Sequence, residues 1–505
     1  KDQTTLEFEE FKLPFNGKLK ADNRWVKLAG LIPWEQFEEA YASQFSSRTG
    51  AGALSFRIAL GALIIKERLR LTDREAVEQI AESPYLQYFL GFQEFKLDPP
   101  FDASMYVHFR KRISSDLLSQ INESVIASSV TQQEEHSESE GDDKTPPSNS
   151  GKLMIDATCT PSDIRYPTDI SLLDEARKKT EKIIDELWRH RHSDCPLTKK
   201  PRTYRRKARK DFLKVIRRQK DHNRYNRNGI RKQLGYVKRN LYHIESLSQY
   251  VPLSVLPKFL YRSLLVVREA YRQQEEMFRE KKHIISDRIV SLTQPHVRPV
   301  VRGKAGKKVE FGAKISASSF MGFSTVDRIS WDGYNEGNDL IFQAEKYRQR
   351  FKCYPSSIHA DKIYLNRYNR QWCKERNIRL SGVPLGRPAK ITKENEKEIK
   401  ERNKILRQDE IDRIDIEARF GHSKRRYGLD RVMAKLANTS ESVISMVFLV
   451  MNLEKILRDL FLALFYRLRS VVCYLNAYGK ANISVFKNYL IADIFQDTLT
   501  WAQIG

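Results

Sequence analysis

The sequence predicts an α/β protein in which a mixed sheet, flanked by helices, is interrupted by a long helical insertion and preceded by an all-helical N-terminal region. Three observations support this prediction. Two short apolar runs of strand type each end in an aspartate, at Asp156 and at Asp361. A strongly basic stretch with helical periodicity lies between them. After the second run, a long charged helix carries Glu417.

The composition points to an anionic partner. The chain has 505 residues, enough for several domains, and a formal net charge of +25. Such an excess of Lys and Arg favours nucleic acid, where cations release condensed counterions from phosphates, with a membrane surface as the alternative. The five cysteines have no metal-binding spacing and are interpreted as reduced thiols of a cytoplasmic protein.

The chain shows no sign of membrane insertion. No basic segment followed by an apolar signal region opens the sequence. The most apolar segment, 443–466, is interrupted by Glu454, Lys455, Arg458 and Asp459. It is therefore predicted to be a buried helix, and no membrane partner is expected.

Residues 1–127 are predicted to form a helical N-terminal DNA-binding domain. Residues 54–68 form an apolar helix, Thr72 caps the next helix and Ser104 precedes another. Short helices joined by tight turns permit a unit of the helix-turn-helix type, with Arg110, Lys111 and Arg112 on an exposed basic turn. A small helical bundle of another function is the alternative.

Residues 128–150 are predicted to be a flexible acidic linker. The segment is rich in Glu, Ser and Pro and nearly free of apolar residues. Such a composition cannot offset the entropy lost on ordering. A domain boundary is therefore placed here.

Asp156 ends the first apolar run, LMIDAT, which spans 153–158. The run lies between Gly151 and Pro161 and has the length of a buried strand. An aspartate at the end of a core strand is costly to bury unless a cation pairs with it. The alternative is that Asp156 caps the following turn.

Residues 169–295 are predicted to form a basic helical insertion. Its first helix begins at Asp169 and has apolar residues at 173, 176, 183, 184 and 187 on one side. From Lys199 to Lys232 there are sixteen Lys and Arg residues against two acids. This imbalance favours a phosphate-contact surface over a merely solvated face. The candidate DNA contacts are Arg205, Arg206, Lys207, Arg209, Lys210, Arg217 and Arg218.

The catalytic core is predicted to comprise 151–168 and 296–440, followed by a C-terminal helical region, 441–505. Alternating apolar residues at 308–317 and a return run at 324–331 indicate a hairpin. Asp339 is predicted to cap a helix that reaches Phe351, and a short strand then ends in Asp361. A helix at 366–377, a brief strand and a charged helix from about Thr392 complete the order.

Without the insertion, this order resembles that of the ribonuclease H fold. In that fold three strands are antiparallel neighbours and a later strand lies beside the first. The resemblance implies that Asp156 and Asp361 lie side by side and that the last helix brings Glu417 across the sheet.

Arg413, Glu417 and Lys424 share one face of the last helix. Their separations of four and seven residues are close to one and two full turns of an α-helix. The alternative is a solvated helix with i,i+4 ion pairs. Three carboxylates that converge repel by several kcal/mol per pair at an effective dielectric constant of about 20. Such a cluster requires divalent cations, and its oxygen donors favour two Mg²⁺ or Mn²⁺ ions. No His/Cys set is expected to compete with them nearby.

These residues resemble those of the DDE transposases of bacterial insertion sequences, in particular the IS5-like families that include the IS1182-type group. There the Glu-bearing helix follows the pattern Tyr-x2-Arg-x3-Glu-x6-Lys. Arg413, Glu417 and Lys424 match it, whereas Glu410 stands at the Tyr position. The motifs IDAT at Asp156 and HADKIY at Asp361 resemble the two Asp motifs of the family.

The resemblance implies a transposase in which Asp156, Asp361 and Glu417 are the catalytic metal ligands. It implies metal-dependent cleavage and strand transfer at the terminal inverted repeats, with target DNA as a further substrate and a homodimer as the acting form. Arg413 and Lys424 would orient DNA or neutralise transition-state charge, and Lys424, Arg425 and Arg426 could instead form a simple backbone clamp. His359 and His422 are candidate bases, or structural histidines. A nuclease without joining activity, or a catalytically idle DNA-binding protein, remains an alternative.

Overall fold

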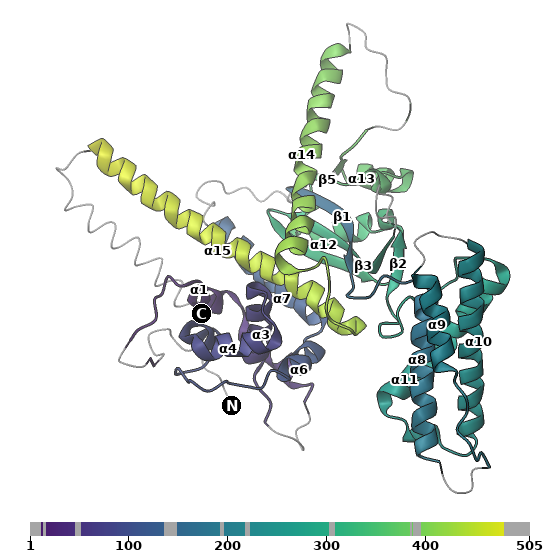
Figure 1. The fold of residues 1–505 in the computed structure, drawn as a ribbon. Coiled ribbons are helices and arrows are strands. Elements are labelled where there is room, and N and C mark those ends of the chain that lie inside the picture. The colour runs from purple at the N-terminus through teal and green to yellow at the C-terminus, as the bar shows by residue number, and fades with distance from the viewer. Residues whose placement is uncertain are drawn as a thin grey trace.

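The computed structural model describes residues 12–13, 17–45, 52–135, 149–191, 196–217, 223–301, 309–383, 386 and 395–478. Figure 1 shows three regions: a group of helices from the first part of the chain, a sheet with helices on its faces, and a helical insertion beside the sheet. The predicted mixed α/β architecture is observed. The division into domains remains a prediction.

The N-terminal part is helical, as predicted. Its helices are α1 (Arg24–Leu31), α2 (Trp34–Ala42), α3 (Phe56–Leu69), α4 (Asp73–Glu82), α5 (Pro84–Phe89), α6 (Met105–Arg112) and α7 (Ser115–Glu135). Thr72 forms a capping box with Glu75 at the start of α4. Helix α7 extends beyond position 127, so residues 128–135 are helical and not part of a flexible linker. The rest of that predicted linker, 136–148, lies outside the described residues.

The sheet has six strands in the order β2-β3-β1-β5-β6, with β4 also paired to β3. The strands are β1 (Lys152–Pro161), β2 (Arg298–Val301), β3 (Val309–Phe320), β4 (Phe323–Ser330), β5 (Ser357–His359) and β6 (Arg379–Leu380). The predicted hairpin is β3 and β4. Strand β1 lies antiparallel to β3 and parallel to β5, so the later strand is beside the first.

Two helices cover opposite faces of this sheet. Successive serines of β3 show the alternation: Ser318 accepts a hydrogen bond from Gln343 of α12 (Leu340–Phe351), and Ser319 donates one to Asp415 of α14 (Glu396–Tyr427). Asp339 stands at the first position before α12, but its side chain makes no capping bond there and pairs with Arg328 instead. The remaining elements are the helix α13 (Arg367–Glu375) and the short turns η4 (Glu336–Asn338) and η5 (Lys362–Tyr364).

The insertion folds around apolar clusters of its own. It comprises α8 (Asp169–Arg189), α9 (Arg205–Ile216), α10 (Asn223–Ser248), η3 (Leu253–Val255) and α11 (Lys258–Glu280). The five inner positions predicted for α8 are buried, and they pack on α10 and α11. These clusters are separate from the main core, which indicates that the insertion is stabilised largely by its own contacts.

Helix α15 (Ala437–Tyr478) joins the N-terminal helices to the sheet. Its buried residues, Ile444 to Ile456, belong to one apolar core shared by both regions. Asn452 donates hydrogen bonds to Asn122 of α7 and to the Ser324 carbonyl of β4, both at 2.8 Å. From Phe461 onward the described apolar side chains are exposed, so only the first part of the predicted C-terminal apolar segment is core.

No described helix combines the length and the apolar character that a bilayer span requires. This finding includes α15, whose charged residues interrupt its apolar run.

Candidate active site

Asp156 lies in the middle of β1 and not at its end. The strand continues to Pro161 because it pairs with β3 along its whole length. The Asp156 carboxylate accepts a hydrogen bond from the Ala157 amide at 2.8 Å. Burial raises the pKa of Asp156 to about 6; the Ala157 hydrogen bond lowers it in part, and nearby carboxylates raise it further. Asp361 and Glu417 are among those carboxylates.

Asp361 reaches the same edge because β1 and β5 are parallel. Met154 is paired with His359, so Asp156 and Asp361 follow the last pair by the same number of residues. Strand β5 ends there while β1 continues, and the chain turns at Asp361 into η5. The Asp361 carboxylate caps this turn by accepting the Lys362 amide at 2.7 Å. Both carboxylates therefore lie at the edge where β1 extends past its neighbour.

Helix α14 brings Glu417 to this edge. Ile416, Phe420 and Tyr427 are buried against the sheet and fix the rotation of the helix. Arg413 then lies between two of the predicted acids: its guanidinium is 3.0 Å from an Asp361 oxygen and 3.3 Å from a Glu417 oxygen. One cation thus bridges carboxylates that are distant in sequence. The three acids predicted from the sequence lie at one edge of the sheet, although they do not form a group with all ligand atoms within 4.8 Å of one another.

Lys424 faces the same edge. Its ammonium donates a hydrogen bond of 2.8 Å to the Thr158 hydroxyl, two residues after Asp156. The two following cations, Arg425 and Arg426, are exposed, and the Arg426 guanidinium lies 5.8 Å from the Tyr427 ring centre. Lys424 is therefore part of the site wall, whereas its neighbours face solvent.

The sequence pattern missed Glu336. This residue opens η4, between β4 and α12, and its carboxylate is one of those that raise the pKa of Asp156. Lys314 of β3 pairs with it at 2.5 Å. No spacing rule connects Glu336 to Asp156, so its position emerges only from the folded chain.

A second group of potential ligands lies nearby, contrary to the expectation that no histidine set would compete. His359, Asp409 and Asp412 place ligand atoms within 4.8 Å of one another. Arg379 binds Asp409 through two contacts of 2.7 Å, and Lys152 binds Asp412 at 2.6 Å. Because both carboxylates already have cationic partners, this group is interpreted as an anchor of α14 on the sheet.

Neither candidate histidine contacts the three acids. His359 is fully buried, and burial lowers its pKa while Asp409 and Asp412 oppose that shift. His422 packs against Tyr427 with ring centres 5.4 Å apart, and burial, followed by neighbouring arginines, lowers its pKa. Both positions favour the structural interpretation.

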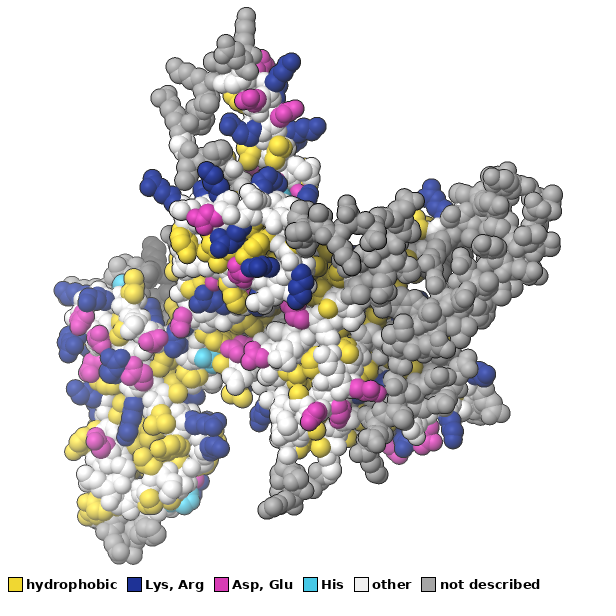
Figure 2. All heavy atoms as spheres, turned by 180° about the vertical axis from the view of Figure 1, so that it is seen from behind, with side chains coloured by type: hydrophobic (Ala, Val, Ile, Leu, Met, Phe, Trp, Pro, Cys, Tyr) yellow, Lys and Arg dark blue, Asp and Glu magenta, His cyan; other side chains and the backbone are white. Residues whose placement is uncertain are grey.

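The basic surfaces differ in how free their cations are. Figure 2 shows Lys and Arg side chains along α14 and over the insertion, with acidic side chains interspersed in the insertion. Arg205 is held by Asp185 at 2.5 Å and by the Glu181 carbonyl at 3.1 Å. In contrast, no described carboxylate forms an ion pair with the exposed cations Arg206, Lys207, Arg209, Lys210 and Arg217. Arg218 lies outside the described residues.

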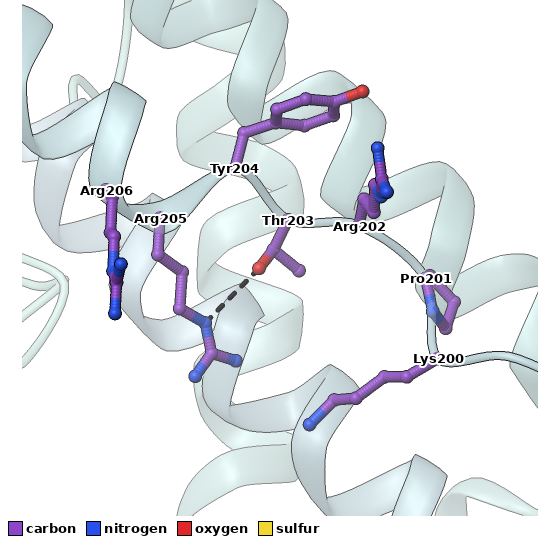
Figure 3. Close-up of a pocket in the computed structure, with 7 residues that line it drawn as sticks. All are labelled: Lys200, Pro201, Arg202, Thr203, Tyr204, Arg205 and Arg206. Atoms are coloured by element: carbon purple, nitrogen blue, oxygen red, sulfur yellow. Dashed lines mark hydrogen bonds between the residues drawn. The ribbon is translucent and has the colours of Figure 1, made fainter.

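A pocket marks the loop before α9. It is lined by Lys200, Pro201, Arg202, Thr203, Tyr204, Arg205 and Arg206 (Figure 3). Lys200 also binds Asp185, at 2.6 Å. Two cations of the pocket, Lys200 and Arg205, therefore hold the loop against α8. All four cations of the pocket are exposed, and no described carboxylate forms an ion pair with Arg202 or Arg206.

The predicted basic turn of the N-terminal region is the last turn of α6. Arg110 forms a two-contact ion pair with Asp73, at 2.9 and 2.7 Å, and the Arg112 guanidinium lies 4.4 Å from the Phe45 ring centre. Lys111 alone of the three is exposed. The expectation of an exposed basic turn was therefore wrong for Arg110 and Arg112, whose side chains contribute to packing.

Two segments of the chain match known protein families. The profile of a family described as "Transposase DDE domain" matches residues 358–454, which include Asp361 and Glu417. A second profile, "Transposase domain (DUF772)", matches residues 14–112. No solved structure matches the chain.

A curated relative is an uncharacterized protein, ORF8 in the nfe locus of Rhizobium meliloti. It is 33% identical over 147 residues, which are 29% of this chain and 66% of the relative. The chain therefore spans slightly less than two thirds of that protein. The two profile matches cover the N-terminal helices and the segment carrying Asp361 and Glu417, and their combination is consistent with the IS1182-type group. The two family matches support a DDE transposase of an insertion sequence.

Proposed function

We propose that this transposase cleaves DNA at the terminal inverted repeats of its insertion sequence and joins the ends to target DNA. In this proposal Asp156, Asp361 and Glu417 hold two Mg²⁺ or Mn²⁺ ions. The observation that supports it most is the position of Arg413, whose guanidinium contacts both Asp361 and Glu417 beside Asp156.

The donor set fits such ions. All three groups are carboxylates, and hard oxygen donors suit Mg²⁺ and Mn²⁺ better than softer metals. The raised pKa of Asp156 reflects burial together with repulsion from its acidic neighbours, which a divalent cation would relieve. When bound, a pair of such ions activates the attacking oxygen and stabilises the leaving oxygen of a phosphodiester.

The cations of the site have distinct tasks in this proposal. Lys424, held by Thr158, presents a positive charge beside Asp156 where a phosphate oxygen would lie. Arg413 orients Asp361 and Glu417 and is itself about one-third exposed, at 32%. It can therefore contact the DNA backbone from the same position. Arg425 and Arg426 extend the basic surface away from the acids.

The core is proposed to be ribonuclease H-like. The support is the strand order, in which β1 lies between the antiparallel β3 and the parallel β5, together with one helix on each face of the sheet. In this arrangement acids from β1, the end of β5 and a following helix share one edge.

DNA is proposed to contact both the N-terminal helices and the insertion. A homodimer is proposed as the acting form, because two ends must be held together before they are joined. The exposed apolar side chains of α15, namely Phe461, Leu462, Phe465 and Tyr466, are consistent with a contact between subunits.

The strand-transfer reaction tests the proposal. Purified protein is mixed with paired end fragments from both borders of the element, supercoiled target DNA and Mg²⁺ or Mn²⁺. The proposal expects cleaved ends and joined products that depend on the ions. Nicked ends without joined products would indicate a nuclease, and binding without cleavage would indicate an idle DNA-binding protein.

Neutralising the free cations of α9 should weaken DNA binding uniformly. Replacing Arg206, Arg209 and Lys210 by Gln removes about three phosphate contacts, which lowers the slope of log affinity against log salt by roughly 2.7. Fluorescence anisotropy across a salt series measures this slope.

The matched control for this experiment replaces Lys258, Arg262 and Arg268 of α11 by Gln. These residues are also exposed, and the change in net charge is the same. An equal effect of both triple variants would show that net charge alone is responsible and would contradict a contact surface on α9.

A further inference from the structure

Glu336 is held against the segment that carries Asp361. Gly337, the next residue of η4, packs so closely on η5 that a Cβ at this position would lie 2.5 Å from the Ile363 carbonyl oxygen. The buried Asn369 side chain donates to the Gly337 carbonyl at 2.7 Å and to the Tyr364 carbonyl at 2.8 Å. The two turns therefore form one unit, and Glu336 has a fixed position relative to Asp361.

The Glu336 carboxylate is also held from the sheet. The Lys314 ammonium pairs with its Oε2 at 2.5 Å and donates to the Tyr334 carbonyl at 2.9 Å. Both charged side chains are largely buried, at 15% and 19% exposure. The Lys314 ammonium occupies one oxygen of this carboxylate, so the other oxygen can serve as a ligand.

The pairing of β1 with β3 places this carboxylate near Asp156. Lys314 is opposite Cys159, three residues after Asp156, so its partner Glu336 lies along the same stretch of β1. Glu336 is also among the carboxylates that raise the pKa of Asp156, together with Asp361 and Glu417. Burial raises the pKa of the Tyr364 phenol, and the next largest causes are Glu336 and then Asp156. Lys314 lies on the same face of β3 as Ser318, which contacts α12, so Glu336 approaches from the face of the sheet opposite α14.

We propose that Glu336 is a fourth carboxylate ligand of the cation site, oriented by Lys314. The geometry supports this role because the acids then approach Asp156 from two sides: Asp361 and Glu417 on the α14 side, and Glu336 from η4. A purely structural role, in which Glu336 only neutralises Lys314, is the competing explanation. This inference rests on the proposed function, since it adds a ligand to the same site.

The test measures Mn²⁺ binding directly, on the full chain without DNA, from the loss of the free Mn²⁺ signal in electron paramagnetic resonance. Glu336→Gln should weaken Mn²⁺ binding at the site at least about tenfold, as expected when a group of a metal site is lost. Lys314→Met should weaken Mn²⁺ binding less than Glu336→Gln does, because the carboxylate remains but loses the partner that orients it. Glu401→Gln, on the exposed part of α14, is the control for charge alone.

The outcomes separate this inference from the proposed function. If Asp156→Asn abolishes binding but Glu336→Gln does not alter it, the fourth ligand is overturned and the proposed site stands. If Asp156→Asn also leaves binding unchanged, the proposed site itself fails. Should Glu336→Gln not fold, Glu336→Asp provides the test: its shorter side chain keeps the charge but should still weaken Mn²⁺ binding about tenfold, and an unchanged affinity overturns the inference.

Discussion

Asp156→Asn is expected to abolish metal-dependent cleavage of the element ends while leaving DNA binding within twofold of the unmutated chain. Asn retains the shape of the side chain but removes the charge that would bind the cation. Loss of roughly 4 kcal/mol of transition-state stabilisation corresponds to about a thousandfold in rate. Single-turnover cleavage of labelled end fragments measures the rate, and anisotropy in Ca²⁺ measures binding.

The control for this variant is Asp98→Asn, an exposed aspartate remote from the sheet. It should cleave at the rate of the unmutated chain. Cleavage by Asp156→Asn at a comparable rate would contradict a role for β1 in the chemistry. The same loss is expected for Asp361→Asn and Glu417→Gln, because the three carboxylates act on one site.

Arg177→Met is expected to destabilise the insertion more than any other single change there. The Arg177 guanidinium is 2% exposed and binds Asp174 at 2.6 Å and Glu181 at 2.5 Å. Removing one partner of a buried ion pair leaves uncompensated charge and costs about 3–5 kcal/mol. Lys178 and Arg205 still contact these acids, so we expect a loss near the lower end of that range. Urea unfolding measures the change in free energy.

Hydrogen exchange shows where this loss occurs. Because the insertion has its own apolar clusters, exchange in α8 and α10 should increase while exchange in β1 and β3 does not. Arg189→Met, which removes an exposed pair on the same helix, should change stability by less than about 0.5 kcal/mol. Equal destabilisation of the sheet would contradict the insertion as a separate unit.

The fold was predictable where the apolar periodicity of a segment matches the face that the segment buries. The inner face of α8 and the β3–β4 hairpin follow periods that the sequence displays directly. The full length of β1 does not, because residues 157–161 are in a strand only through pairing with β3. Strand β2 was also missed, since four residues with a proline give no period. Nor could the sequence show that α15 joins the N-terminal helices to the sheet.

The part of the candidate site that depends on sequence motifs and on strand order was predictable. Asp156, Asp361 and Glu417 follow from two strands and one helix, and the parallel pairing of β1 with β5 explains their meeting. Glu336 depends on a close contact between two turns, which no spacing reveals.

The cations were harder to assign. Arg110 and Arg205 have the appearance of free cations in the sequence, yet each is bound by an aspartate at least 20 residues away. Partners so distant along the chain are set by tertiary packing. A run of basic residues therefore predicts the charge of a surface but not which of its members are available to DNA.

The central claim is that a divalent cation binds between β1, the end of β5 and α14. Anomalous scattering from crystals of the full chain soaked in Mn²⁺ tests it most directly. The account predicts an anomalous peak within about 2.2 Å of carboxylate oxygens of both Asp156 and Asp361. Manganese bound at His359, Asp409 and Asp412, with none beside Asp156, would contradict it.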